Sequence, residues 1–240
     1  MNIDILAIIP ARGGSKGVPR KNIKNINGKP LISYTIEAAK KSKYINRVVV
    51  STDDSEIAEI SKKYGAEIPC FRPKTLAGDV SPTVDAVIHM IDYLKKSEGY
   101  LPDYIMLLQC TSPLRNYQHI NEAVEKLIDT GKKAIISVCE SEVNPYWTNV
   151  FEGDNLIPFI KDGINFTRRQ DLPEVYRING AIYLIETKLF LEERSFQPSN
   201  LTGYVMDPYH SVDIDTELDF KIAEVIISEL LKDDNKWENQ

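Results

Sequence analysis

The sequence predicts an α/β fold, a doubly wound and mostly parallel Rossmann-like sheet with helices on both faces. Its 240 residues, with 42% hydrophobic content, suffice for one sizeable core. Short apolar runs bounded by turn residues alternate with segments of helical periodicity, which is the order typical of such sheets. We therefore expect residues 1–240 to form a single domain, with ligands bound at the carboxyl ends of its strands.

The expected elements follow one another along the chain. The apolar runs that predict strands are 5–10, 47–51, 104–109, 134–138 and 181–185. The segments that predict helices are 30–41, 55–64, 83–96 and 119–130, with a last helix running to Leu231. Local signals support this order, because Asp53 and Asp54 offer a cap to the second helix, Gly65 stops it, and Pro30 opens the first.

Residues 140–176 interrupt the alternation. They are rich in turn signals and hold short apolar pieces, so we expect an excursion from the sheet domain that contains a small β-ribbon. Its aromatic residues need burial, either in a partner subunit or against their own chain: Tyr146, Trp147, Phe151, Phe159 and Phe166. We expect this inserted excursion to mediate dimerisation, which makes the protein a homodimer.

Composition excludes several classes of function. The net charge of −6 argues against a nucleic-acid binder, and no apolar run approaches the length of a membrane span. The N-terminal residues have neither a basic leader nor a cleavage site, so we expect a cytoplasmic protein with no membrane partner. Cys70, Cys110 and Cys139 are widely spaced, which suggests reduced thiols rather than disulfides or a zinc site.

A glycine-rich basic loop follows the first strand. Within residues 11–29 there is no acidic residue, whereas six residues are basic: Arg12, Lys16, Arg20, Lys21, Lys24 and Lys29. The glycines permit close approach of backbone N–H groups to a phosphate, and the cations neutralise it. The spacing matches neither a Walker loop nor a dinucleotide fingerprint. It predicts a different phosphate-binding loop, although a solvated basic loop is the alternative.

An acidic segment precedes the C-terminal helix. Asp213 and Asp215 are two residues apart, so on an extended segment they point to one side and can share Mg²⁺. Asp215 or Thr216 could instead cap the helix. The phosphate-type loop favours the magnesium interpretation, because Mg²⁺ is usually held by a few carboxylates together with phosphate oxygens. We expect His210 to orient the segment rather than to bind the metal.

Two further polar segments lie at strand ends. Gln109 and Ser112 end the expected central strand, where doubly wound folds place ligands. Arg177 and Asn179 lead into the last expected strand, where the guanidinium could meet a carboxylate and the amide could bond hydroxyls. Taken singly, each could equally be a surface or turn residue.

Together these segments resemble the acylneuraminate cytidylyltransferase family, which makes CMP-sialic and CMP-legionaminic acids. The matching motifs span almost the whole chain: IIPARGGSKG at 8–17, VSTD at 50–53, RP at 72–73, LQ at 108–109, TSPLR at 111–115, NGAIY at 179–183 and DIDTELD at 213–219. The resemblance implies a nucleotidyltransferase that transfers CMP from CTP to the anomeric hydroxyl of a nine-carbon sugar acid and releases pyrophosphate.

The resemblance also implies roles for individual residues. The expected nucleotide-binding residues are Ala11, Arg12, Gly13, Lys21, Asn22, Arg72, Ser81 and Thr83. The expected sugar-acid-binding residues are Gln109, Ser112, Arg177, Asn179, Tyr183 and Phe196. Asp213 and Asp215 would bind Mg²⁺, and Arg12, Lys21 and Asp215 would be catalytic.

Two departures from the family pattern bear on the substrate. Cys110 stands where proline is common, and Trp147 stands where some sialic-acid enzymes have a lysine that reaches the partner's active site. Arg168 and Arg169 could replace that charge. The identity of the nine-carbon acid stays open at this point. So do three alternatives: a cytidylyltransferase for the eight-carbon acid KDO, a glycosyltransferase with an Asp-x-Asp metal site, and a catalytically silent nucleotide-binding module.

Overall fold

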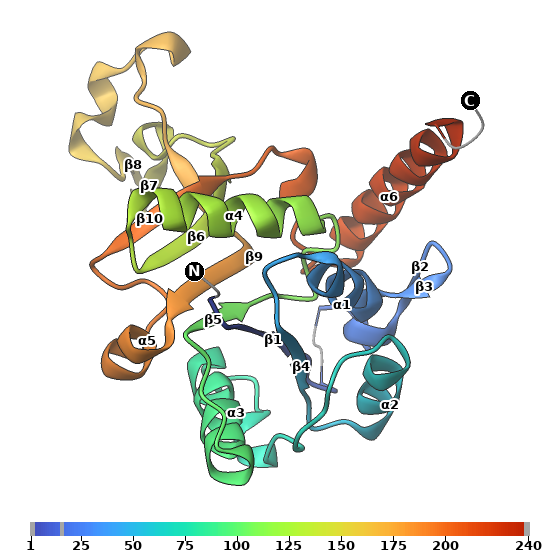
Figure 1. Ribbon diagram of the computed structural model, residues 1–240. Helices are drawn as coiled ribbons and strands as arrows, with labels where there is room; N and C mark the ends of the chain where they lie inside the picture. The colour runs from blue at the N-terminus through green and yellow to red at the C-terminus, as the bar shows by residue number, and fades with distance from the viewer. Residues whose placement is uncertain (1–2, 15–16, 238–240) are drawn as a thin grey trace.

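The structure, a computed structural model, describes residues 3–14 and 17–237 and is built around a six-stranded sheet (Figure 1). In sheet order the strands are β10 (Leu201–Val205), β6 (Ala134–Glu140), β9 (Tyr176–Glu186), β5 (Tyr104–Leu107), β1 (Ile5–Pro10) and β4 (Arg47–Ser51). β1 is parallel to β4 and β5, and β10 is parallel to β6, whereas β9 runs antiparallel between β5 and β6. The mostly parallel sheet predicted from the sequence is confirmed.

Helices cover both faces of this sheet because the side chains of each strand alternate between the faces. Ile5, Ala7 and Ile9 of β1 are buried on the face covered by α1 (Leu31–Lys41), α2 (Ser55–Lys63) and α4 (Tyr117–Thr130). Leu6 and Ile8 are buried on the opposite face, against α3 (Thr83–Glu98) and α5 (Thr187–Glu193). The doubly wound arrangement is therefore also confirmed.

A third apolar cluster attaches the C-terminal helix, α6 (Glu217–Trp237), to the side of the sheet domain. Phe220 and Ile227 of α6 pack with Val18, which follows the basic loop, and with Ile214 in the acidic segment. Beyond this cluster the helix projects from the body of the protein (Figure 1). A short hairpin of β2 (Asn25–Ile26) and β3 (Lys29–Pro30) leads from the basic loop into α1.

The expected helix signals operate at α2. The Asp54 carboxylate accepts hydrogen bonds from the backbone N–H groups of Glu56 and Ile57, at 2.9 and 3.0 Å. These are two of the donors that the first turn of a helix leaves without an intrahelical partner. Gly65 follows the helix with φ of +89°, a conformation that few other residues adopt.

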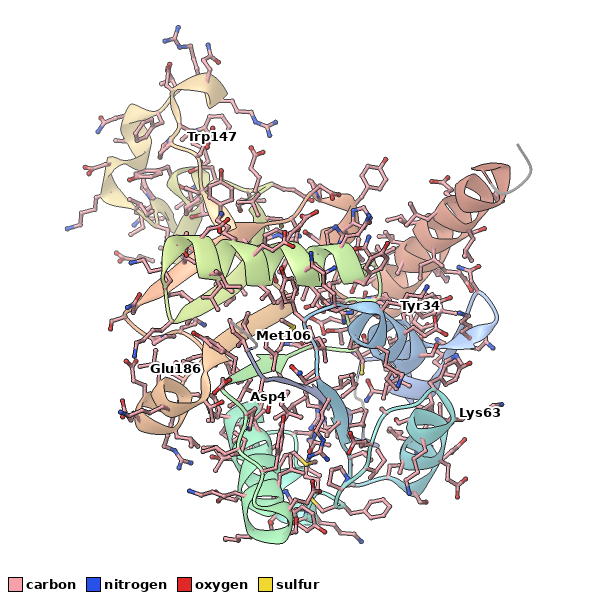
Figure 2. All side chains as sticks on the ribbon, in the orientation of Figure 1. Asp4, Tyr34, Lys63, Met106, Trp147 and Glu186 are labelled. Atoms are coloured by element: carbon pink, nitrogen blue, oxygen red, sulfur yellow. The ribbon has the colours of Figure 1, made fainter. Side chains whose placement is uncertain are left out.

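The excursion contains the expected ribbon, formed by β7 (Asn149–Glu152) and β8 (Asn155–Pro158). Short 3₁₀ turns flank it: η3 (Pro145–Trp147), η4 (Lys161–Asn165) and η5 (Arg169–Asp171). The segment projects from one corner of the sheet domain, with Trp147 far from the central strands (Figure 2). Tyr146 packs on Phe166 at 4.9 Å between ring centroids, whereas Phe151 and Phe159 remain 75% and 66% exposed. Some of the aromatic side chains thus pack within the excursion and others are left on its surface.

Some boundaries differ from the sequence-based expectation. α5 and β10 were not predicted, β5 ends at Leu107, and β9 begins at Tyr176 instead of residue 181. The polar start of β9 is strand because it pairs with the end of β6, Tyr176 opposite Glu140 and Arg177 opposite Cys139. The excursion therefore ends where β9 begins. Within the described residues, no helix is both long and apolar enough to cross a membrane.

Candidate active site

A cleft of about 430 Å³ opens at the carboxyl ends of β1 and β5, where a doubly wound fold places ligands. It is lined by Pro10, Arg12, Gly17, Lys21, Asn22, Arg72, Leu76, Gly78, Asp79, Ser81, Thr83, Gln109, Cys110, Thr111 and Asp215. These residues come from the basic loop, the loop before α3, the end of β5 and the acidic segment. The chain thus brings four distant segments to one cleft.

The basic loop is held against the end of β4 by its backbone. The Ala11 N–H donates to the Ser51 carbonyl at 2.9 Å, and the Gly13 N–H donates to the Asp53 carboxylate at 3.0 Å. The Asn22 amide donates to the Arg12 carbonyl at 3.0 Å. Because these two N–H groups are already bonded, Ala11 and Gly13 shape the loop rather than offer their N–H groups to a phosphate.

Gly17 brings the basic loop into direct contact with the acidic segment. A Cβ atom placed on Gly17 would lie 2.0 Å from the backbone carbonyl oxygen of Asp215, a separation that no side chain tolerates. The position therefore requires glycine for close approach rather than for a positive φ. This contact joins two segments almost 200 residues apart in the sequence.

Lys21 strengthens the same junction. It lies in η1 (Lys21–Ile23), and its ammonium donates to the Ile214 carbonyl and lies 3.5 Å from the Asp215 carboxylate. The Lys21 side chain is only 13% exposed, whereas that of Asp215 is 77% exposed. The Lys21 ammonium is thus held in place by the Ile214 carbonyl, while the Asp215 carboxylate projects into the cleft.

The six basic residues of the loop divide into two groups. Arg20 pairs with Asp54 and Glu56. Lys24 pairs with Glu217 at 2.6 Å and Lys29 with Glu37 at 2.9 Å. Of the described members, only Arg12 and Lys21 line the cleft, and Lys16 lies outside the described residues. Of the five basic residues that the structure describes in this loop, it thus places two at the candidate phosphate site.

Arg72 forms one wall of the cleft from a buried position. Its guanidinium donates to the Ser51 carbonyl at 2.6 Å and to the Ser51 hydroxyl at 3.1 Å. Burial lowers the pKa of this guanidinium, and the nearby positive charge of Arg12 lowers it further. Ser81, in the loop that leads into α3, and Thr83, the first residue of α3, lie on the same cleft.

The acidic segment offers oxygen atoms suited to a hard cation. Asp215 lines the cleft, whereas Asp213 is partly buried and does not. One oxygen of Asp213, Oδ1, is buried without a hydrogen-bond partner among the described residues. Burial raises the pKa of Asp213, with the Thr111 hydroxyl acting in the opposite direction and the charge of Asp215 raising it further. An unpaired buried carboxylate oxygen beside an exposed carboxylate fits a magnesium site.

The residues predicted to bind a sugar acid are only partly gathered at the cleft. Gln109 lines it, and a Cβ on Gly180 would lie 3.6 Å from Asp213 Oδ2 and 3.9 Å from the Gln109 amide carbon. The rings of Tyr183 and Phe196 pack together with 5.7 Å between their centroids, and Phe196 is only 9% exposed within the core. These contacts place β9 beside the acidic segment, but they make Phe196 mainly a packing residue.

Asn179, which was predicted to bind the sugar acid, lies away from the cleft. This residue is 1% exposed and does not line the cleft. Its amide accepts from the Ser137 hydroxyl at 2.6 Å and donates to the Ser211 hydroxyl at 2.9 Å. The network fixes β6, β9 and the turn η6 (Tyr209–Ser211) to one another, so Asn179 has no free group for a sugar hydroxyl.

Two other expected sugar contacts also lie away from the cleft. Ser112 is fully buried, and its hydroxyl has no partner among the described residues. Arg177 is exposed on the outer part of β9. Neither side chain is part of the cleft wall.

Sequence reasoning missed several residues of the site. Asp79 forms an ion pair with Arg12 at 2.9 Å across the cleft, and Thr111 lines the floor. Thr111 begins the TSPLR motif at 111–115, so the sequence could have indicated it as a site residue. Asp79 is part of an ordinary turn sequence that carries no such signal. A second unpredicted cluster joins His119, Asp207 and His210, whose ligand-type atoms lie within 4.8 Å of one another.

The geometry of this cluster argues against a metal there. His119 Nδ1 accepts the Asn116 N–H at 3.2 Å in the capping box of α4, and His210 Nδ1 lies 2.6 Å from the Asp207 carboxylate. The neutral His119 ring therefore carries its proton on Nε2, so that nitrogen is not a metal ligand. The cluster instead attaches the η6 turn to α4, which agrees with the expectation that His210 orients the acidic segment.

The chain matches a family model described as cytidylyltransferase over residues 6–224. It belongs to the cytidylyltransferase family. A CMP-N,N'-diacetyllegionaminic acid synthase of Legionella pneumophila is 35% identical to this cytidylyltransferase over 93% of this chain and 96% of its own. A pseudaminic acid cytidylyltransferase of Campylobacter jejuni is 37% identical over 92% and 95% of the two chains.

A solved structure shares the fold of this cytidylyltransferase. It is a CMP:2-keto-3-deoxy-manno-octonic acid synthetase complexed with CTP, with a TM-score of 0.69 over 94% of this chain and 99% of that one. Its 17% identity makes this a likeness of fold alone. The family membership and the Rossmann-like fold predicted from the sequence are both confirmed, while the roles of the individual site residues remain predictions.

Proposed function

We propose that this cytidylyltransferase transfers CMP from CTP to the anomeric hydroxyl of a nine-carbon sugar acid and releases pyrophosphate. One observation carries the proposal: Arg12, Lys21 and the exposed carboxylate of Asp215 line one cleft at the carboxyl ends of the strands, where Lys21 lies 3.5 Å from Asp215. Two cations suit a polyphosphate, and a carboxylate beside them suits its divalent counterion. The substrates named for the full-length relatives support the choice of acid.

The residues around the acidic segment fit magnesium. We propose that Asp213 and Asp215 hold it, since one has an unpaired buried oxygen and the other projects into the cleft. When bound, Mg²⁺ would neutralise charge on the phosphate oxygens of CTP. Substrate binding, orientation and proton transfer depend on the chain's own residues.

These residues bind and orient both substrates. Arg12 and Lys21 stabilise negative charge as it develops on the phosphate groups, and the bond from Lys21 to the Ile214 carbonyl keeps its ammonium in position. Arg72, Ser81 and Thr83 enclose the nucleoside end of the cleft.

Other residues position the acceptor. Gln109 faces the sugar acid from the end of β5, and Tyr183 of the neighbouring strand β9 lies opposite Leu107. Asp215 is exposed on the cleft and is placed to take the proton of the attacking hydroxyl. The hydroxyl then attacks the α-phosphorus in line with the departing pyrophosphate, so positioning supplies much of the rate enhancement.

We further propose that the excursion mediates a homodimer. Phe151 and Phe159 stand exposed on a segment that projects from the sheet domain (Figure 1), and Trp147 of the same segment is 44% exposed. Burying such side chains against a second copy is favourable, and a two-fold interface would bury them twice. We place the reaction in the cytoplasm because it consumes CTP.

Pyrophosphate release from CTP and Mg²⁺ tests this proposal with a panel of free acids. The panel contains N-acetylneuraminic, legionaminic, pseudaminic and KDO-type acids, and each component is omitted in turn. Release that requires CTP, metal and one nine-carbon acid is the expected result. Release with the eight-carbon acid alone would instead identify a KDO-type enzyme. CTP binding without release with any acid would identify a silent nucleotide-binding module.

A further inference from the structure

Asp79 forms a side-chain link across the candidate phosphate site. Its carboxylate lies 2.9 Å from the Arg12 guanidinium, and both side chains line the cleft. The two side chains are 43% and 30% exposed, so an incoming ligand can reach both. The link connects the basic loop to the loop that precedes α3.

The loop that carries Asp79 is anchored at both ends. At one end the Arg72 N–H donates to the Thr52 carbonyl at 2.7 Å, and at the other the chain enters α3 at Thr83. Between these points η2 (Lys74–Leu76) is followed by a turn in which the Ser81 N–H donates to the Gly78 carbonyl at 3.2 Å. The Ser81 hydroxyl also donates to the Thr75 carbonyl at 3.2 Å. Asp79 is therefore presented at the tip of an ordered turn.

The charges around this link explain what it does in the ligand-free protein. Arg12 and Arg72 are close enough for the charge of Arg12 to lower the pKa of Arg72, so like charges repel one another here. Asp79 pairs with Arg12, one of these two cations. It also places a carboxylate against the cation that a polyphosphate would need, so the two anions compete for one guanidinium.

We propose that Asp79 sets the affinity of this site for polyphosphates, because it occupies Arg12 until a phosphate group replaces it. The inference rests on the proposed function, in which Arg12 binds the triphosphate. The same exchange operates in reverse after the reaction. The ion pair between Asp79 and Arg12 forms again as pyrophosphate departs, and this competition weakens the binding of that product.

Titration calorimetry with CTP and with inorganic pyrophosphate, each with Mg²⁺, tests the proposal. Asp79→Asn removes the competing charge and keeps the size of the side chain, so both ligands should bind about two- to five-fold more tightly, as expected for an exposed ion pair. Asp129→Asn is the matched control, since it makes the same change of net charge at an exposed residue near the end of α4, outside the cleft. It should leave both affinities unchanged.

A double-mutant cycle identifies the partner. In an Arg12→Met background, Asp79→Asn should tighten binding less than it does in the wild type, because the competition for the Arg12 guanidinium is gone. Asp79→Glu, which keeps the charge, should bind like the wild type. Asp79→Ser also removes the charge and should tighten binding in the same way, so it replaces the amide variant if that variant fails to fold.

The outcomes separate this inference from the proposed function. If the wild type binds CTP but Asp79→Asn binds it equally well or more weakly, the competition is refuted and the function stands. A wild type that binds neither CTP nor pyrophosphate overturns both.

Discussion

Gly17→Ala should damage catalysis because it separates the basic loop from the acidic segment. The added Cβ would lie 2.0 Å from the Asp215 carbonyl oxygen, whereas ordinary contacts begin near 3.4 Å, so the backbones must move apart by about 1.4 Å. Lys21 already lies 3.5 Å from the Asp215 carboxylate and donates to the neighbouring Ile214 carbonyl. The shift therefore falls on the pair of groups proposed to act on the phosphate.

The expected loss is large for so small a change. Displacing a catalytic group by about 1 Å can cost on the order of 100-fold in rate, so we expect kcat/KM to fall by roughly that factor. Pyrophosphate release measures turnover, and thermal unfolding checks that the variant remains folded. Gly14→Ala in the same loop is the matched control, because its Cβ would meet no described atom within 4 Å. Near-normal turnover of Gly17→Ala would refute the reasoning.

Three further predictions concern the catalytic pair, a partly buried histidine and a buried amide. Lys21→Ala and Asp215→Ala should each lose several kcal/mol of transition-state stabilisation without unfolding; near-normal pyrophosphate release by either would remove its catalytic role. Burial and the charge of His210 lower the pKa of His119 to about 4, so the folded state binds fewer protons than the unfolded state between pH 6.5 and 4. Stability should fall by about 2 kcal/mol as pH decreases through that window, allowing for partial exposure, and urea unfolding at pH 7 and 4.5 should show His119→Gln to be less acid-sensitive. If the wild type and His119→Gln lose the same stability between pH 7 and 4.5, His119 is not the source of the acid sensitivity. Asn179→Ala should lower the free energy of unfolding by about 2–4 kcal/mol, because buried hydroxyl partners lose their hydrogen bonds, with little change in the KM for the acid. A raised KM with unchanged stability would instead restore Asn179 as a sugar ligand.

The alternation of apolar runs and helical periodicity was enough to predict the sheet and its covering helices. Strands such as β1 and β4 are buried on both faces, so each contains an unbroken apolar run, ILAIIP in β1 and VVV in β4, that is easily recognised. α5 has seven residues and β10 has five with a glycine at its centre, so neither carries a strong local pattern. Both form because neighbouring elements supply their partners, β6 in the case of β10.

The candidate site likewise contains residues that local sequence signals identify and residues whose role depends on packing. Glycines and cations after the first strand, and paired carboxylates before the last helix, have local signatures, so Arg12, Lys21 and Asp215 could be selected from the sequence. Asn179 also stands in a recognisable motif, but the motif does not say whether the amide faces a ligand or a buried hydroxyl. In the structure the Asn179 amide is buried and forms hydrogen bonds with the hydroxyls of Ser137 and Ser211.

The sequence by itself determined the fold class, the family and the chemistry of the groups available to the site. Tertiary structure alone decided which of these groups meet: Gly17 against the Asp215 carbonyl, Asp79 on Arg12, and Lys24 and Lys29 turned to other carboxylates. The physical reason is that composition and periodicity report the local preference of a segment for burial and for helix or strand. Contacts between segments far apart in the chain depend on the packing of the whole sheet and its helices, which no local pattern encodes.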